Sequence, residues 1–149
     1  MEALLETPEA IAPETPPDGE EAKPSTIKDK WQGAVTQGSG FVAVPVALLR
    51  LQSKYGLTPT DMLVLINLLA HWWDPARAVY PRSTTIAKRM GVDKRTVQRA
   101  THKLEKAGLL SRDTTDEGRR VFTFDRLVAK LANDVPAAYV IQAHETYDT

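Results

Sequence analysis

Two short amphipathic segments meet at a single glycine in the stretch "TTIAKRMGVDKRTVQRATHKLEKAGLL", residues 84–110. Apolar residues recur at helical spacing on both sides of Gly91, and Ala87 is small where a second helix must cross the first. So tight a turn needs a positive φ angle, which glycine adopts at low cost. The stretch therefore predicts a helix capped by Ser83 and a second helix capped by Asp93 that ends before Gly108. The expected inward residues are Ile86, Met90, Val92, Val97, Ala100 and Leu104.

The same stretch is the most basic part of a chain whose formal net charge is zero. Residues 75–130 contain fourteen Lys and Arg against six Asp and Glu, a formal charge of +8. Residues 1–30 contain three Lys against eight acids, a formal charge of −5. Clustered cations repel one another unless a partner offsets them, which favours a surface that binds a polyanion. An ordinary solvated face is the alternative.

A chain of 149 residues is long enough for one domain with tails. It has no Cys, which excludes a disulfide framework and a thiolate metal site and is typical of an intracellular protein. The first thirty residues are acidic and rich in Pro, so we expect a disordered, acidic, Pro-rich tail over residues 1–38. This segment lacks the pattern of a signal peptide, and no apolar run in the chain is long enough to span a membrane.

Two further helices are expected before the basic stretch. Residues 46–51 are apolar at helical spacing and precede Gly56, which is typical of a short helix with a glycine cap. Thr58 is a good N-cap, Pro59 suits the first helical position, and Asp61 in the first turn suits both a capping interaction and the helix dipole. The apolar run that follows predicts the central buried helix of the domain, ended by Pro75.

A hairpin and a last helix are expected after the basic stretch. The runs "LLSRDTT" and "RRVFTFD" are rich in Leu, Thr, Val and Phe and flank the turn residues "DEG", the pattern of a β-hairpin. The run "DRLVAKLAND" predicts a short helix that ends near residue 134, followed by a C-terminal tail over residues 135–149. The expected fold is mainly α with a small β-hairpin, in a domain over residues 39–134.

Two helices joined by a tight turn form a helix-turn-helix pattern, whose second helix can enter the major groove of DNA. With the basic hairpin that follows, the order of elements resembles the winged helix-turn-helix domain of bacterial regulators such as the MarR and GntR groups. Residues 41–124 also resemble the helix-turn-helix domains of phage and plasmid replication initiators. The stretch "TIAKRMGVDKRTVQRATHKLEKAGLL" is specific for the domain type, but the same domain serves repressors, activators and initiators. Ala100 departs from this pattern, because a branched residue is usual at that inward position; we expect a neighbouring helix to complete the packing there.

The exposed face of the second helix carries side chains that can read DNA. Arg and Lys can donate to guanine, Gln can pair with adenine, and Thr can contact a thymine methyl group. The face is expected to consist of Lys94, Arg95, Thr96, Gln98, Arg99, Thr101, His102 and Lys103. By similarity to other helices that enter the groove, the N-terminal half contacts bases. The expected base-reading residues are Arg95, Thr96, Gln98 and Arg99.

Phosphate contacts and a wing complete the expected interface. Free backbone N–H groups and hydroxyls at the start of the first helix can anchor a phosphate, although helix capping alone also explains the hydroxyls. The expected phosphate contacts are Ser83, Thr84, Thr85, Lys94, Lys103 and Lys106. The expected wing residues are Arg112, Arg119 and Arg120. Resemblance to winged helices implies that Arg119 or Arg120 enters the minor groove, and solvated strand ends are the alternative.

Other chemistry has little support in the sequence. Trp72 and Trp73 can in principle stack on single-stranded nucleic acid, but adjacent tryptophans at the end of an apolar helix are more often core residues. The three His lack a second ligand at metal-binding spacing. No phosphate-binding loop, serine elbow or paired-carboxylate motif occurs. We therefore expect no catalytic residues, no metal site and no cofactor.

The sequence thus predicts a sequence-specific double-stranded DNA-binding protein, a transcriptional regulator that represses by occupying an operator. A replication-initiation protein of a phage or plasmid that binds origin repeats is one alternative, and a winged-helix protein-interaction module is another. A homodimer is expected, because one recognition helix reads only a few base pairs. The protein is expected in the bacterial cytoplasm, associated with the nucleoid and without a membrane partner. Its tails are candidate contacts for a protein partner, and the acidic tail is also explained as a decoy for the basic face or a solubilising linker.

Overall fold

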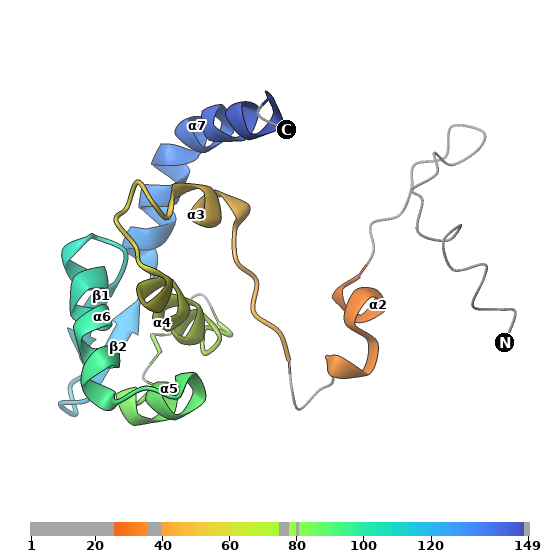
Figure 1. The fold of residues 1–149 in the computed structure, drawn as a ribbon. Helices are drawn as coiled ribbons and strands as arrows, with labels where there is room; N and C mark the ends of the chain where they lie inside the picture. The colour runs from red at the N-terminus through yellow and green to blue at the C-terminus, as the bar shows by residue number, and fades with distance from the viewer. Residues whose placement is uncertain (1–25, 36–39, 75–77, 80, 148–149) are drawn as a thin grey trace, which may run out of the picture. The chain divides into compact units, whose positions relative to one another are not determined.

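The computed structural model describes residues 26–35, 40–74, 78–79 and 81–147, with side chains as far as Pro136. The chain divides into two units, Met1–Gly40 and Phe41–Thr149, which are considered separately (Figure 1). The second unit contains every residue of the expected interface. It consists of helices and one two-stranded antiparallel sheet, so the prediction of a mainly α fold with a small β-hairpin is confirmed.

The described part of the first unit is a short helix, α2 (Ile27–Trp31), followed by the 3-10 turn η3 (Gln32–Ala34). The hydroxyl of Thr26 accepts a hydrogen bond from the backbone N–H of Asp29, and the Asp29 carboxylate accepts one from the N–H of Thr26, both at 3.1 Å. No residue of α2 or η3 is buried, so this local capping box accounts for the helix. The helix departs from the expected disorder of residues 1–38, of which 1–25 and 36–38 lie outside the described residues.

The two helices expected at the start of the second unit are α3 (Val46–Leu51) and α4 (Pro59–Leu69). Thr58 and Asp61 form a capping box at the start of α4. The Thr58 hydroxyl accepts from the Asp61 N–H at 3.1 Å, and the Asp61 carboxylate accepts from the Thr58 N–H at 2.9 Å. As expected, α4 is the central helix. Its buried apolar side chains are Met62, Val64, Leu65, Leu68 and Leu69.

The end of α4 differs from the prediction that Pro75 stops it. The helix ends at Leu69, several residues before that proline. The N–H groups of His71 and Trp72 donate to carbonyls three residues earlier, those of Leu68 and Leu69, at 3.1 and 3.0 Å. These tighter bonds replace the α-helical ones, so the chain has already left the helix before the proline.

The turn that follows α5 (Ser83–Met90) and precedes α6 (Lys94–Lys106) has the geometry that the sequence predicts. Gly91 has a φ of 69°, in the left-handed region. The next N–H, that of Val92, donates to the Ala87 carbonyl at 3.0 Å, which closes the end of α5. Ala87 and Val97 are buried where the two helices contact each other. The turn therefore fixes the crossing of α5 and α6.

Ser83 is not the N-cap of α5. That position belongs to Arg82, whose carbonyl accepts the first helical bonds, from the N–H groups of Thr85 at 3.0 Å and Ile86 at 3.3 Å. The Arg82 side chain makes no capping hydrogen bond. The helix begins one residue earlier than a cap at Ser83 would allow, so Ser83 is the first helical residue. Asp93, by contrast, caps α6 as predicted, through a bond from the Thr96 N–H.

The hairpin consists of β1 (Ser111–Thr114) and β2 (Arg120–Thr123), which pair antiparallel with Arg112 opposite Phe122. Gly118 lies in the connecting turn with a φ of 80°. Phe122 also exchanges two backbone hydrogen bonds with Val79, at 2.8 and 2.6 Å. The segment that leads into α5 is thereby attached to the hairpin.

The last helix, α7 (Asp125–Tyr147), is longer than predicted. The predicted end near residue 134 is wrong, because the helix continues through Pro136. A proline inside a helix costs about 3 kcal/mol through the lost N–H bond and a clash with the preceding turn. Ala137 and Ala138 directly after it are good helix formers, whereas Asn133, Asp134 and Val135 directly before it are weak ones. The first half of α7 packs against α3, and the Tyr55 hydroxyl donates to the Asp134 carboxylate at 2.7 Å.

One hydrophobic core unites the helices of the second unit. Trp72 packs on Phe124 with ring centroids 5.0 Å apart, whereas Trp73 is 74% exposed, so only the first of the adjacent tryptophans belongs to the core. Among the described residues, no helix is both long and apolar enough to cross a membrane. The largest fully buried side chains are Phe124, Leu48, Leu51, Leu65, Leu68, Ile86, Leu104, Leu109, Leu110, Val64 and Val97.

Replacing Gly91 by Ala should lower the free energy of unfolding by about 1–2 kcal/mol, because a Cβ atom disfavours the left-handed conformation. A Cβ added at Gly91 meets nothing within 4 Å, so the loss is one of backbone conformation and not of packing. Urea unfolding followed by circular dichroism measures it. Gly91→Asn is the matched control and should lose less, because Asn tolerates this conformation better. Equal stability of the Ala variant and the wild type would contradict the expectation.

Candidate nucleic-acid interface

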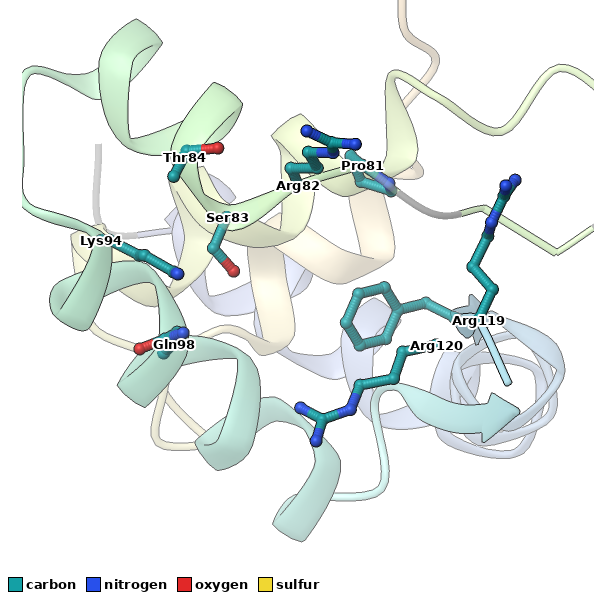
Figure 2. Close-up of a pocket in the computed structure, with 9 residues that line it drawn as sticks. Pro81, Arg82, Ser83, Thr84, Lys94, Gln98, Arg119 and Arg120 are labelled. Atoms are coloured by element: carbon teal, nitrogen blue, oxygen red, sulfur yellow. The ribbon is translucent and has the colours of Figure 1, made fainter. Parts of the chain in front are cut away.

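A groove of about 650 Å³ lies between the start of α5, the first half of α6 and the hairpin (Figure 2). In Figure 2, Ser83, Lys94 and Gln98 line the helical side, and Arg120 extends from the hairpin toward α6. None of the lining residues is acidic, so the charged lining is entirely cationic. The lining residues are Pro81, Arg82, Ser83, Thr84, Lys94, Gln98, Arg119, Arg120 and Phe122.

The groove brings together residues that the sequence predicts for three separate roles. Ser83 and Thr84 come from the expected phosphate contacts, Gln98 from the base-reading set, and Arg119 and Arg120 from the wing. Thr85 is exposed but lines a different hollow, which shares Pro81 and Arg82 with this groove.

Three lining residues were not predicted from the sequence: Pro81, Arg82 and Phe122. Arg82 could have been found from the sequence. It directly precedes Ser83 and Thr84, the expected phosphate contacts at the start of α5, so its charge lies beside theirs. Phe122 has no such signal in the sequence, because its place in the groove depends on the register of β1 against β2 and on the bridge to Val79.

The outer face of α6 presents further cations to solvent. Arg95, Arg99 and Lys106 are exposed there, together with His102. They do not line the groove, so the base-reading and phosphate residues predicted on α6 divide between the groove wall and the outer face of the helix.

The N-terminus of α6 is fixed by Asp93. Its carboxylate accepts hydrogen bonds from the Thr96 backbone N–H at 2.7 Å and from the Thr96 hydroxyl at 2.8 Å. These bonds, followed by the nearby Arg99 and Arg95, hold the pKa of the Asp93 carboxyl below its usual range. The Thr96 hydroxyl, predicted to read a base, is therefore already engaged in the cap.

Thr101 does not belong to the exposed face. Only 4% of it is exposed, and its hydroxyl donates to the Val97 carbonyl at 2.8 Å. Its position follows from helical spacing, because it lies four residues after Val97 and three before Leu104, which both point inward. The sequence therefore contained the signal that the prediction of an exposed Thr101 missed.

Lys103 is paired within the domain. Its Nζ lies 2.7 Å from Oδ2 of Asp61, the carboxylate that also caps α4. Burial of Asp61, which is 5% exposed, raises the pKa of its carboxyl, but the hydrogen bonds from Lys103 and Thr58 outweigh this, and the net pKa is lowered. The salt bridge ties α6 to α4, and a phosphate contact by Lys103 would compete with it.

Arg112 is also paired within the domain. Its Nη2 lies 2.6 Å from Oε1 of Glu105 on α6, and its guanidinium lies over the Phe122 ring at 5.5 Å from the centroid. Of the three wing cations, Arg119 and Arg120 line the groove, whereas Arg112 faces α6. Among the described residues, no group of three or more His, Cys, Asp or Glu could hold a metal ion.

Helices α5 and α6 across a left-handed turn, followed by a two-stranded hairpin that borders the same groove, define a winged helix-turn-helix domain. Residues 55–110 match a protein-family model described as a helix-turn-helix domain. The predicted resemblance to winged helix-turn-helix domains is thereby confirmed. No curated protein sequence matches the chain.

The chain is similar to several solved structures, and the first of those below shows the same fold. The N-terminal domain of the DnaD protein from Geobacillus kaustophilus is similar with a TM-score of 0.53 and 21% identity, over 70% of this chain and 88% of that one. A protein from the archaeon Sulfolobus tokodaii gives a TM-score of 0.46 at 21% identity, over 70% and 96%. A MepR mutant from S. aureus, bound to an oligodeoxyribonucleotide, gives 0.44 at 19% identity, over 70% and 72%.

Replacing Asp61 by Asn should lower stability at neutral pH and flatten its decline in acid. The pKa of Asp61 is lower in the folded protein than in the unfolded chain, so the carboxylate stabilises the fold above the usual Asp pKa of about 3.9. That contribution is lost as the pH falls through the folded value, and the Asn variant lacks it at every pH. Urea unfolding at a series of pH values from about 2 to 7 measures the difference.

The control for this experiment is Asp116→Asn, which changes an exposed carboxylate in the hairpin turn and should leave the acid limb as in the wild type. If the free energy of unfolding falls equally steeply in acid for the Asp61→Asn variant and the wild type, the pairing of Asp61 with Lys103 does not contribute to stability.

Proposed function

We propose that the chain is a sequence-specific double-stranded DNA-binding protein that regulates transcription, with α6 in the major groove. The observation that carries the proposal is the basic groove, which joins the start of α5, the wall of α6 and the hairpin and has no acidic lining residue. Both strands of DNA present a phosphate charge to such a surface. The match of residues 55–110 to a helix-turn-helix family supports the same function.

The exposed side chains of α6 support base recognition. Arg95, Gln98 and Arg99 are exposed, and Thr96, partly exposed in the cap, completes the proposed base-reading set. A helix of 13 residues is about 20 Å long, and the major groove is about 12 Å wide, so α6 is long enough to place its first two turns against base edges. Arg and Gln are the side chains that distinguish guanine and adenine there.

The start of α5 and the ends of α6 are proposed to contact the phosphate backbone. The first N–H groups of a helix have no partner within it, and the N-cap Arg82 provides no side-chain cap. Ser83, Thr84 and Thr85 supply hydroxyls beside them, and Lys94 and Lys106 supply charge. Arg82, which lines the groove, joins this set. Lys103 is left out because it is paired with Asp61.

The hairpin is proposed as the wing. Arg119 and Arg120 line the groove and point in different directions (Figure 2). These different directions support a contact of one arginine with the DNA phosphate backbone and of the other with the adjacent minor groove. A narrow minor groove attracts arginine through its negative potential.

Repression by occupancy of an operator is the regulatory role that we propose, with a homodimer bound to two half-sites. One recognition helix reads only a few base pairs, and a second copy about one helical turn away supplies the missing affinity and specificity. Selection of sites from a random DNA library, followed by footprinting, tests the binding of a dimer to two half-sites. An enriched inverted repeat supports the proposal. No salt-dependent binding to any DNA would overturn it in favour of a protein-interaction module.

Arg99→Ala should weaken binding to the selected site by about 1–3 kcal/mol and leave binding to random DNA almost unchanged, because a base contact discriminates between sequences. Lys94→Ala should weaken binding to both DNAs alike and reduce the slope of log K against log salt by about one unit, because a phosphate contact releases counterions from any sequence. Fluorescence anisotropy titrations at several salt concentrations measure both effects.

The matched control is Lys54→Ala, which removes an exposed cation beside Tyr55 that does not line the groove, and it should bind both DNAs as the wild type does. Equal losses on both DNAs for Arg99→Ala would remove Arg99 from the base-reading set. An unchanged salt slope for Lys94→Ala would remove Lys94 from the phosphate contacts.

A further inference from the structure

Arg112 is held in the structure by two different groups. Its Nη2 lies 2.6 Å from Glu105 Oε1 near the end of α6, and its guanidinium lies 5.5 Å from the centroid of the Phe122 ring on the paired strand. The side chains of Arg112 and Glu105 retain only 32% and 24% exposure. The cation therefore connects the recognition helix α6 with both strands of the hairpin.

The carboxylate of Glu105 requires this cation. Its Oε1 is buried and accepts no hydrogen bond from the described residues, so the charge of Arg112 is what offsets it. If Arg112 turned to a phosphate, it would leave a partly buried carboxylate on α6 without its cation, and the buried Oε1 would have no charge to offset it, which is unfavourable. The same anion would lie next to a surface proposed to bind DNA and would repel the phosphates.

Phe122 transmits the position of Arg112 to the groove. It lines the groove, and Arg120, two residues earlier on the same strand, lines it as well, because alternate side chains share one face of a strand. The other edge of β2 is also fixed, by two hydrogen bonds of Phe122 with Val79, four positions before the start of α5. The contact of Arg112 with Glu105 and Phe122 thus sets how far the wing stands from α6.

We propose that Arg112 is a positioning residue for DNA binding: it stays on Glu105 and Phe122, neutralises the anion on α6, and fixes the wing so that Arg120 faces the groove. This proposal rests on the proposed function. It differs from a direct wing contact with DNA, the role that the sequence alone suggests for this arginine.

A double-mutant cycle in the full-length chain separates the two roles. Arg112→Met should weaken binding to the selected site and to random DNA by about tenfold or more, because the unpaired Glu105 repels DNA and the wing is released. The double variant Arg112→Met with Glu105→Gln should recover most of this loss, because the anion is gone and Met can still pack on the Phe122 ring. Its salt slope should equal that of the wild type. A phosphate contact by Arg112 predicts no recovery and a slope lower by about one unit, and either result would overturn the proposal.

The matched control is Arg120→Met, which removes a wing cation proposed to contact DNA. Its salt slope should fall by about one unit, and Glu105→Gln should not restore its affinity. Recovery of Arg120→Met to the same extent would show that the loss of any nearby anion restores binding, and would overturn the specific role of Arg112.

Thermal unfolding of the same variants without DNA provides an independent measurement. The two single variants should lower Tm more in sum than the double variant does, because the double variant leaves no unpaired charge. Additive effects would overturn the pairing. If the wild-type chain binds no DNA, the proposed function fails and this role fails with it. If the wild type binds and the double variant is not rescued, only the positioning role fails.

Discussion

The left-handed turn at Gly91 is the constraint on which the rest of the domain depends. It redirects the chain between α5 and α6, so that the two helices contact each other and bury Ala87 and Val97. The crossing of the two helices decides which side of α6 is covered. The uncovered side carries the cations, and the start of α5 lies at the edge of the same groove. A local backbone conformation thus determines where a basic surface can form.

Most features that depend on neighbouring residues could be predicted from the sequence, although the N-cap of α5 was not. The capping box of Thr58 with Asp61, the cap of α6 at Asp93, and the glycine turn each involve residues within three or four positions, and all form as their spacing indicates. The hairpin follows from its turn residues in the same way. The length of α7 was not predicted: the expected helix ended near residue 134, whereas α7 continues to Tyr147 through Pro136, although a proline inside a helix costs about 3 kcal/mol.

Pairing between charges could not be predicted, because it depends on which elements become neighbours. The salt bridge of Lys103 with Asp61 joins residues 42 positions apart. From the sequence alone, every Lys and Arg of α6 looks available to contact DNA. Asp61 has a sequence signal for capping α4 but none for a lysine on another helix. Glu105 and Arg112 are closer in sequence, yet they contact each other only because the chain turns back at Gly108 into β1.

These two ion pairs change how the basic surface of α6 works in the proposed function. Each cation placed on a phosphate strengthens binding to any DNA, whatever its sequence, and makes binding more sensitive to salt. Lys103 and Arg112 are held by carboxylates, so they attach α6 to α4 on one flank and to the hairpin on the other instead of adding to that general attraction. Discrimination between sequences then depends on Arg95, Gln98 and Arg99, whose positions relative to the backbone contacts are fixed by the attached helix. In the proposed function, Asp61 and Glu105 therefore contribute to specificity without contacting DNA, because they determine which cations remain available and where α6 lies.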